Sequence, residues 1–340
     1  MFRAHVWLAP LLAAVACPAA EAQAPPPAGP NRLVVWHESV LVSLDPDGTN
    51  EKVVLRPPAG RDAVIRWWPL VVSPDGRRVA GEMYRVEPRT FRQFYRLGVH
   101  EIGNAKNAEL DEIGKASAVA WSADGTQLAF APHTDDDQEM PKPVAFIYTV
   151  ATKARERVNL PPDHFPLDWS RDGKRFVTRV DIPLPNDDWS SELWLVNRDG
   201  APNKRLVAGN YSGGPARFSP DGTRVLTHVT TRPPPETPEQ KAARAKRRLP
   251  RPYGRAEWSV VDVATTAVTP VRGVPPVAQV FNFCWSPDGT RLAYVSNDYV
   301  GDTTISRLTV CAATGANPRT VLTATGKGER RIVLGGVDWR

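Results

Sequence analysis

Cysteine is scarce in this sequence: there are three among 340 residues, with no Cys-x-x-Cys pair and no Cys/His cluster. The ligand spacing of a structural zinc site is therefore absent. Cys284 and Cys311 lie in segments that we expect to be the first and third strands of one sheet, roughly 9 to 10 Å apart from the usual strand spacing. This separation excludes a disulfide between them, so both are expected to be buried thiols.

The N-terminal apolar run, residues 6–16, is too short to cross a bilayer as a helix. A basic residue precedes the run, and Ala22 and Ala24 each end a motif with the small residues that signal peptidase requires. We therefore expect residues 1–24 to be an export signal and residues 25–30 to be a Pro-rich leader.

Two other interpretations of this segment remain open. Ala14-Val15-Ala16-Cys17 resembles a lipoprotein cleavage box, which would leave a lipid anchor on Cys17. The third interpretation is an uncleaved, disordered tail. If residues 1–24 are an export signal, or if Cys17 carries a lipid anchor, we expect the rest of the chain to be exported to the periplasm or the cell exterior, with no transmembrane span.

What the sequence does contain is a repeated turn, an aromatic residue or valine followed by Ser-x-Asp-Gly and an alternating apolar run. Aspartate accepts hydrogen bonds from nearby amides, and glycine tolerates the positive φ that closes a tight hairpin. Each copy therefore predicts a β-hairpin. The Asp-Gly pairs, which we interpret as structural, are Asp75-Gly76, Asp124-Gly125, Asp172-Gly173, Asp221-Gly222 and Asp288-Gly289.

The spacing of these turns indicates a propeller. Successive aspartates are 49, 48, 49 and 67 residues apart, and a period in the high forties with several short strands is typical of propeller blades. Each period contains four β-prone segments, which we name strands a to d. In the last repeat they span residues 279–286, 290–296, 305–311 and 319–323.

The two ends of the chain complete a sixth blade. Residues 334–339 match a strand a, whereas residues 32–36 match a strand b and residues 40–55 match strands c and d. Pairing the two ends closes the ring and removes its open sheet edges. The predicted fold class is all-β, a six-bladed β-propeller of four antiparallel strands per blade that spans residues 31–340.

The Trp-Ser-x-Asp-Gly and Leu-Ala-aromatic repeats resemble the TolB-type family of six-bladed propellers built from WD40-like (PD40) repeats. The resemblance covers residues 31–340 and implies the fold. Such repeats serve several roles, since they occur in periplasmic adaptors and in the gating propellers of prolyl-oligopeptidase-like enzymes. We identify no counterpart of the small α/β domain that TolB carries ahead of its propeller, so the specific role of TolB is not expected.

Loop lengths suggest which face of the ring is functional. The a–b turns are short and uniform, whereas the b–c loops, which share the opposite face with the d–a loops, vary widely. The longest contains an insertion at 233–252, where Thr237-Pro238-Glu239-Gln240 predicts a helix that runs to about Leu249. An acidic run at residues 134–139 is expected to be a solvated loop rather than a Ca²⁺ site.

The predicted helix is basic on nearly every side and has no apolar face to bury. It is expected to project into solvent, either as a mobile insertion or as a docking element for an anionic partner, an acidic protein or a membrane surface. Nucleic acid is not expected as a partner, because no aromatic stacking pattern accompanies these charges. The basic residues are Lys241, Arg244, Lys246, Arg247 and Arg248.

Polar residues near the start of strand a are candidates for contacts with a ligand at the mouth of the central channel. The alternative is that they form hydrogen bonds or salt bridges between blades. These residues are Arg66, His164, Asp168, Tyr211 and Arg217, with Arg61, Asp62, Asp163 and Asp338 at neighbouring or matching positions.

Catalytic motifs are lacking: there is no Gly-x-Ser-x-Gly elbow, and blades occupy the whole of residues 31–340. We therefore expect an exported, non-catalytic scaffold that binds a protein or a ligand in the periplasm or cell envelope, without a cofactor or a metal. The alternative is a secreted propeller hydrolase or lyase, in which His37, His133 and His228, each after a strand b, converge as metal ligands.

Overall fold

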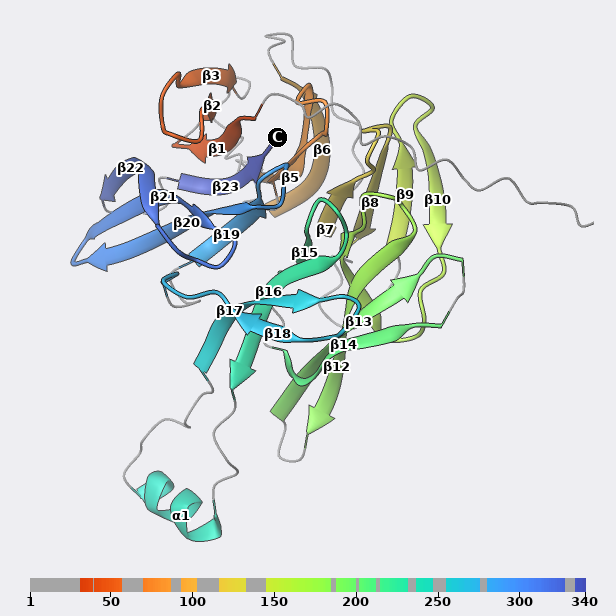
Figure 1. The fold of residues 1–340 in the computed structure, drawn as a ribbon, viewed down its shortest axis with the longest axis vertical. Coiled ribbons are helices and arrows are strands. Elements are labelled where there is room, and N and C mark those ends of the chain that lie inside the picture. The colour runs from red at the N-terminus through yellow and green to blue at the C-terminus, as the bar shows by residue number, and fades with distance from the viewer. Residues whose placement is uncertain are drawn as a thin grey trace, which may run out of the picture.

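The computed structural model is a ring of six antiparallel blades around a central axis, which confirms the predicted fold class (Figure 1); a β14–β16 pairing joins blades 3 and 4 into one sheet. Residues 1–30, Arg66 and the acidic run 134–139 lie outside the described residues, so the predictions made for them stay predictions. The structure describes residues 31–38, 40–56, 70–86, 93–102, 116–132, 145–184, 188–199, 202–211, 215–231, 237–246, 255–275, 280–327 and 334–340.

We number the blades from the first Asp-Gly turn, and within each blade the strands follow the order a to d. Blades 1 to 3 contain β4 (Leu70–Val72), β5 (Arg78–Val86) and β6 (Gln93–Glu101); β7 (Ala116–Trp121), β8 (Gln127–Pro132), β9 (Ala145–Thr149) and β10 (Ala154–Val158); and β11 (His164–Trp169), β12 (Arg175–Leu184), β13 (Asp188–Asn197) and β14 (Lys204–Tyr211). Blades 4 to 6 contain β15 (Arg217–Phe218), β16 (Arg224–Thr231), β17 (Arg255–Asp262) and β18 (Val268–Pro270); β19 (Val280–Trp285), β20 (Arg291–Val300), β21 (Thr303–Ala312) and β22 (Arg319–Lys327); and β23 (Leu334–Trp339), β1 (Leu33–His37), β2 (Val40–Leu44) and β3 (Lys52–Leu55).

The two ends of the chain close the ring in blade 6, as predicted. Strand β23 pairs antiparallel with β1, placing Leu33 opposite Trp339 and Val34 opposite Asp338. The backbone N–H of Arg340 then donates to the carbonyl oxygen of Arg32 at 2.9 Å. Closure by the termini means that folding of this blade requires contacts between residues about as far apart in sequence as the chain allows.

The Asp-Gly turns explain why five hairpins share one geometry. In blade 5, the Ser286 hydroxyl donates to Asp288 at 2.5 Å and accepts the Arg291 N–H at 2.9 Å, while Asp288 accepts the Thr290 N–H at 3.0 Å. Burial raises the pKa of Asp288, but these hydrogen bonds hold it below its usual value. Gly289 closes the turn with φ of 69°, a left-handed conformation.

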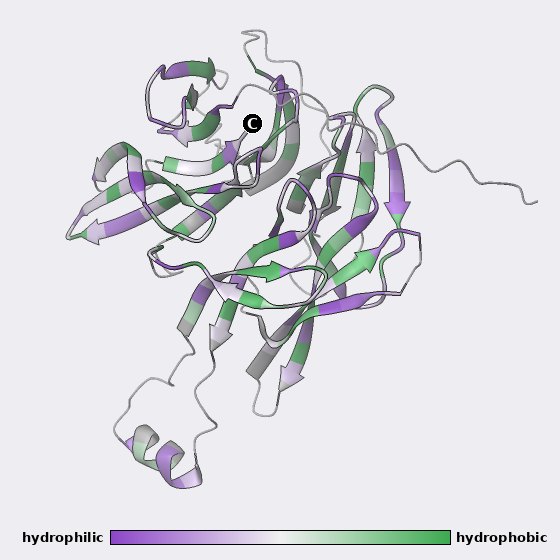
Figure 2. Cartoon of the chain, viewed as in Figure 1, coloured by the Kyte–Doolittle hydropathy of each residue, from purple (hydrophilic) through white to green (hydrophobic). Residues whose placement is uncertain are grey.

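The strand-a aromatics form the core between blades. Arg224 of blade 4 stacks over the Trp285 ring of blade 5 at 4.9 Å, and Arg291 of blade 5 stacks over Trp339 of blade 6 at 4.7 Å. Hydrophobicity falls toward the rim of a blade, as Figure 2 shows for the hydrophilic β10 beside the hydrophobic β9. The apolar stabilisation therefore lies mainly in the inner strands of the blades.

Several hairpins extend further than the sequence predicts. Residues 297–304 were expected to be a loop, yet β20 and β21 stay paired as far as Val300 opposite Thr303. The polar residues in this stretch suggested a loop, but the outer part of the hairpin satisfies its own backbone hydrogen bonds and tolerates exposed side chains. The same extension joins β12 and β13 as far as Leu184 opposite Asp188.

The insertion contains the predicted helix, described as α1 (Pro238–Lys246), and its expected end at Leu249 lies outside the described residues. Its start is a capping box: the Thr237 N–H donates to Gln240 Oε1 at 2.8 Å, and the Gln240 N–H donates to Thr237 Oγ1 at 3.3 Å. Figure 1 shows α1 well away from the ring, beyond the ends of β16 and β17.

Candidate functional site

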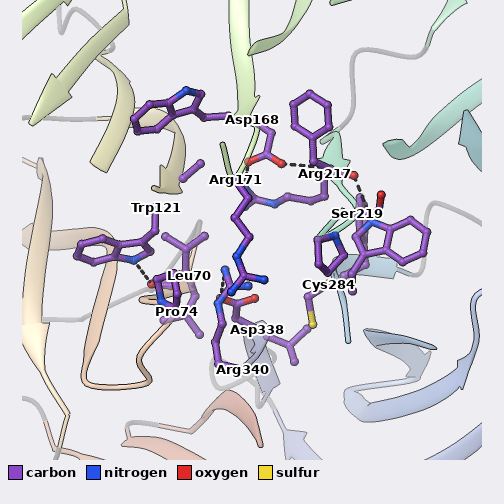
Figure 3. A pocket seen from close by; sticks show the side chains of 18 residues that line it. Leu70, Pro74, Trp121, Asp168, Arg171, Arg217, Ser219, Cys284, Asp338 and Arg340 are labelled. Atoms are coloured by element: carbon purple, nitrogen blue, oxygen red, sulfur yellow. Dashed lines mark hydrogen bonds and ion pairs between the residues drawn. The ribbon is translucent and has the colours of Figure 1, made fainter. Parts of the chain in front are cut away.

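A cavity of about 80 Å³ lies on the axis of the ring, where strands a end and their turns begin (Figure 3). Each blade contributes to its wall the residue that directly precedes the last residue of strand a or its equivalent. These residues are Val71, Ala120, Asp168, Arg217, Cys284 and Asp338. Because the wall also includes turn residues such as Pro74, Arg171 and Pro220, the cavity opens at the a–b turn end of the channel.

This cavity lies at the opposite end of the ring from the b–c loops, which the loop lengths favoured as the functional face; that expectation stays a prediction. Side chains alternate along a β-strand, so the residue before the buried strand-a aromatic or its equivalent lies on the opposite face of the strand from it, and in all six blades this residue lines the cavity. Near the turns, three of those six positions carry charged side chains: Asp168, Arg217 and Asp338.

Asp168 and Asp338 connect neighbouring blades through the backbone. Asp168 of blade 3 accepts the N–H of Phe218 in blade 4 at 2.7 Å, and Asp338 of blade 6 accepts the N–H of Val72 in blade 1 at 2.6 Å. Both carboxylates are buried. Burial raises the pKa of Asp168, although the Arg217 charge and the Phe218 amide act in the opposite direction.

Two arginines at the cavity have clear partners. Arg217 lies 3.4 Å from Asp168 and donates to the Val119 carbonyl oxygen of blade 2 at 3.0 Å. Arg340 lies 3.3 Å from Asp338 and donates through Nε to the Val72 carbonyl oxygen at 2.8 Å. The same side chains thus line the cavity and link neighbouring blades, so the two interpretations made from the sequence are compatible.

Arg171 differs from the other two arginines. It occupies the variable position of the blade 3 turn, and its buried Nε has no hydrogen-bond partner among the described residues. Burial lowers the pKa of Arg171, and the positive charge of Arg340 lowers it further. Figure 3 shows the Arg171 side chain extending toward Arg340 and Asp338.

Of the remaining candidates from the sequence, those whose side chains the structure describes do not line this cavity. His164 is buried in blade 3, where its Nδ1 lies 2.8 Å from the Thr178 hydroxyl and its ring meets Trp194 edge-on. Tyr211 pairs through its backbone with Val229, and its side chain lies outside the described part of the structure. The basic residues Lys241, Arg244 and Lys246 lie in α1, and Arg247 and Arg248 lie outside the described residues.

Sequence reasoning missed Arg171 and Arg340. Arg171 could have been noticed because it is the only charged residue at this position of the five Ser-x-Asp-Gly turns. The equivalent positions hold proline or alanine: Pro74, Ala123, Pro220 and Pro287. Arg340 directly follows Trp339, one residue beyond the end of strand a, and only ring closure brings it to the axis.

The described histidines do not converge on a metal. His228 is buried against Trp258, with the ring centroids 3.9 Å apart, and burial lowers its pKa to about 4. His37 lies 3.7 Å from Glu51, and His133 is outside the described residues. Within the described ranges, no three His, Cys, Asp or Glu side chains are placed to hold a metal ion. Cys284 and Cys311 are both buried and free, as predicted.

Among the residues that the structure describes, no helix has the length and apolar character to cross a membrane. No protein-family model matches the sequence, and no curated protein matches it.

Solved structures do resemble the chain. TolB from Acinetobacter baumannii matches at 17% identity with a TM-score of 0.57, over 91% of this chain and 66% of that one. The chain therefore spans just under two thirds of the length of that relative. A putative TolB from Agrobacterium tumefaciens matches at 16% identity and a TM-score of 0.50, over 92% of this chain and 99% of that one.

A chain of a nidogen/laminin complex matches at 11% identity with a TM-score of 0.53, over 91% of this chain and 98% of that one. Identities this low show the fold alone. Together with the closed ring, they show that the chain has the fold of a TolB-like six-bladed β-propeller.

Proposed function

We propose that this protein is an exported, non-catalytic propeller that binds an anionic protein partner in the periplasm or at the cell envelope. The observation that carries the proposal is α1, a capped helix that stands away from the ring on the face of the b–c loops (Figure 1). Every α1 residue whose side chain is described is exposed. A helix that buries no side chain against its own fold is suited to contact another molecule.

The charge of α1 supports an anionic partner. The helix carries Lys241, Arg244 and Lys246 against a single acidic residue, Glu239, in its first turn. The order agrees with the helix dipole, which favours negative charge at the start and positive charge at the end. Such a patch accelerates encounter with an acidic surface and makes the association sensitive to salt.

Two of the structural relatives are consistent with a binding role. One is a chain from a nidogen/laminin complex, and another is TolB. We extend protein binding to this chain as part of the proposal, since a propeller provides a rigid frame on which loops of one face can vary.

The test is capture of partners from an envelope extract by the chain from residue 25 onward. One variant replaces 233–252 with a Gly/Ser turn, and a second changes Lys241, Arg244 and Lys246 to glutamine, which keeps a helix-forming composition. We expect an acidic protein to bind the native chain, to bind both variants weakly, and to dissociate as salt rises.

The control is a variant with Lys153 and Lys327 changed to glutamine, which removes exposed positive charge from other blades. Loss of capture in this variant to the same degree would show a nonspecific charge effect. Equal capture by the native chain and the Gly/Ser variant would contradict the proposal. So would the absence of any partner together with a stoichiometric bound metal, which would favour a propeller enzyme instead.

A further inference from the structure

We propose that the turn end of the central channel binds one oxyanion group, a carboxylate or a phosphate, between the guanidinium groups of Arg171 and Arg340. This site goes beyond the proposed function, because it lies at the opposite end of the ring from α1 and involves different residues. Figure 3 shows both side chains extending into the same cavity.

The first support is the state of Arg171. Its Nε is buried and makes no hydrogen bond with any described residue, although an arginine nitrogen removed from water ordinarily has an acceptor. The charge that acts on it most directly is the positive charge of Arg340, which is unfavourable. An anion placed between the two groups would supply the missing acceptor and neutralise the repulsion.

The second support is the balance of charge around the cavity. Three guanidinium groups, those of Arg171, Arg217 and Arg340, face two carboxylates, Asp168 and Asp338. Each carboxylate is already engaged, since it accepts a backbone N–H from the next blade and lies close to one arginine. Among the side chains that line the cavity, Arg171 is therefore the surplus cation.

The third support is that the fold does not need an arginine at position 171. The other four turns place proline or alanine there, at Pro74, Ala123, Pro220 and Pro287, and they form the same Ser-Asp hydrogen bonds. In blade 3 the corresponding bond, from Ser170 to Asp172, is 2.5 Å. Arg171 thus contributes a charge to the cavity that turn formation does not require.

Size and shape favour a single oxyanion group. A volume of about 80 Å³ exceeds the roughly 10 to 15 Å³ that one water needs, yet it is well below the several hundred Å³ typical of sites for drug-sized ligands. The planar forks of two arginines match the paired oxygens of carboxylate or phosphate. The charged group would enter the cavity, and any remainder of the ligand would stay outside the turn end.

The test uses the whole chain with acetate and with inorganic phosphate, each compared with chloride at equal ionic strength. We expect at least one of the two anions to bind by calorimetry and to raise Tm relative to chloride. Binding of acetate alone would identify a carboxylate site, and binding of phosphate alone a phosphate site.

Arg171→Gln should weaken this binding by about tenfold or more, the size expected for loss of a hydrogen bond to a charged group. The same variant should have a higher Tm than the native chain in chloride, because the repulsion with Arg340 is gone. A purely structural arginine would give the opposite sign. Lys174→Gln, at an exposed position in the same turn, removes an equal charge and should leave binding and Tm unchanged.

Absence of an anion-specific effect on the native chain would overturn the proposal, as would equal loss of binding in Arg171→Gln and Lys174→Gln. If Arg171→Gln does not fold, Arg171→Lys decides the matter. It keeps the charge but loses the fork, and it should bind the anion more weakly than the native chain while Lys174→Gln does not.

Discussion

The two ends of blade 5 differ in how closely other blades approach them. At the turn end, a Cβ added to Gly315 would collide with the backbone of Arg272 in blade 4, and the Arg272 N–H donates to the Thr314 carbonyl oxygen at 3.1 Å. At the other end, Gly301 between β20 and β21 has no atom within 4 Å of such a Cβ. In blade 5, the turn end is therefore packed backbone against backbone with its neighbour, and the end at Gly301 is open.

This difference explains where the molecule can hold a fixed site and where it can vary. The turn end holds its charged side chains in place through bonds between blades, such as Asp168 to the Phe218 N–H. At the other end, Tyr211 and Val229 pair blade 3 with blade 4, but the β20–β21 hairpin extends outward to Gly301, where no atom lies within 4 Å of an added Cβ, and the α1 insertion lies beyond β16 and β17. Binding residues could thus arise at both ends, and at the turn end hydrogen bonds between blades hold them in place.

The largest effect is expected at Asp168, in the packed end. Asp168→Ala removes the acceptor of the Phe218 N–H and leaves Arg217 without its carboxylate, so it should lower the free energy of unfolding by about 3 kcal/mol or more. Urea denaturation measures this change. Asp302→Ala, at the exposed loop of the open end, is the control and should change stability by less than about 0.5 kcal/mol. Equal losses would remove the distinction between the ends.

The two glycines of blade 5 test the comparison directly. Gly315 and Gly301 both have positive φ, at 87° and 59°, so each alanine substitution carries a cost of about 1 to 2 kcal/mol for the left-handed conformation. Gly315→Ala adds the collision with the Arg272 backbone and should cost about 3 kcal/mol in total. The measurement is urea denaturation of both variants. A Gly301→Ala variant as unstable as Gly315→Ala would show that the open end is packed too.

Buried histidine should make stability depend on pH. The pKa of His228 is lowered by burial to about 4 from an ordinary 6.5, so between these values the unfolded chain binds more protons than the folded one. Stability should therefore fall as pH decreases from 6.5 toward 4, by about 2 kcal/mol from this residue at pH 5. His100, whose pKa burial also lowers to about 4, adds a similar dependence.

His228→Gln should remove about 2 kcal/mol of this dependence at pH 5, because one of the three buried imidazoles, those of His100, His164 and His228, no longer titrates. Urea denaturation at pH 7 and pH 5 gives the two slopes. An unchanged dependence in the variant would mean that His228 is not shielded from water in the folded chain.

The smallest effect is expected from the insertion at the open end. Replacing 233–252 with a Gly/Ser turn should change the free energy of unfolding by less than about 0.5 kcal/mol, since the described α1 side chains are exposed. Thermal denaturation of the two chains checks this. A loss of several degrees in Tm would show that α1 packs against the ring.

The repeats could be recognised from sequence because their chemistry is local. A serine, an aspartate and a glycine within four residues determine each turn, and the apolar alternation that follows determines which side of the strand is buried. The capping box of α1 is equally local, with Thr237 and Gln240 three residues apart. Hairpin length was harder to predict, because the 297–304 stretch pairs through backbone atoms that any side chain would permit.

The sequence by itself determined the blade count, the closure by the termini and the structural role of the Asp-Gly turns. Only the tertiary structure decided that Arg171 and Arg340, 169 residues apart, face one another at the axis. The reason is physical: a turn forms from neighbours in the chain, whereas the cavity exists only when all six strands a surround it. The charges that line the cavity interact through space, so the spacing of these residues in the sequence does not reveal their interaction.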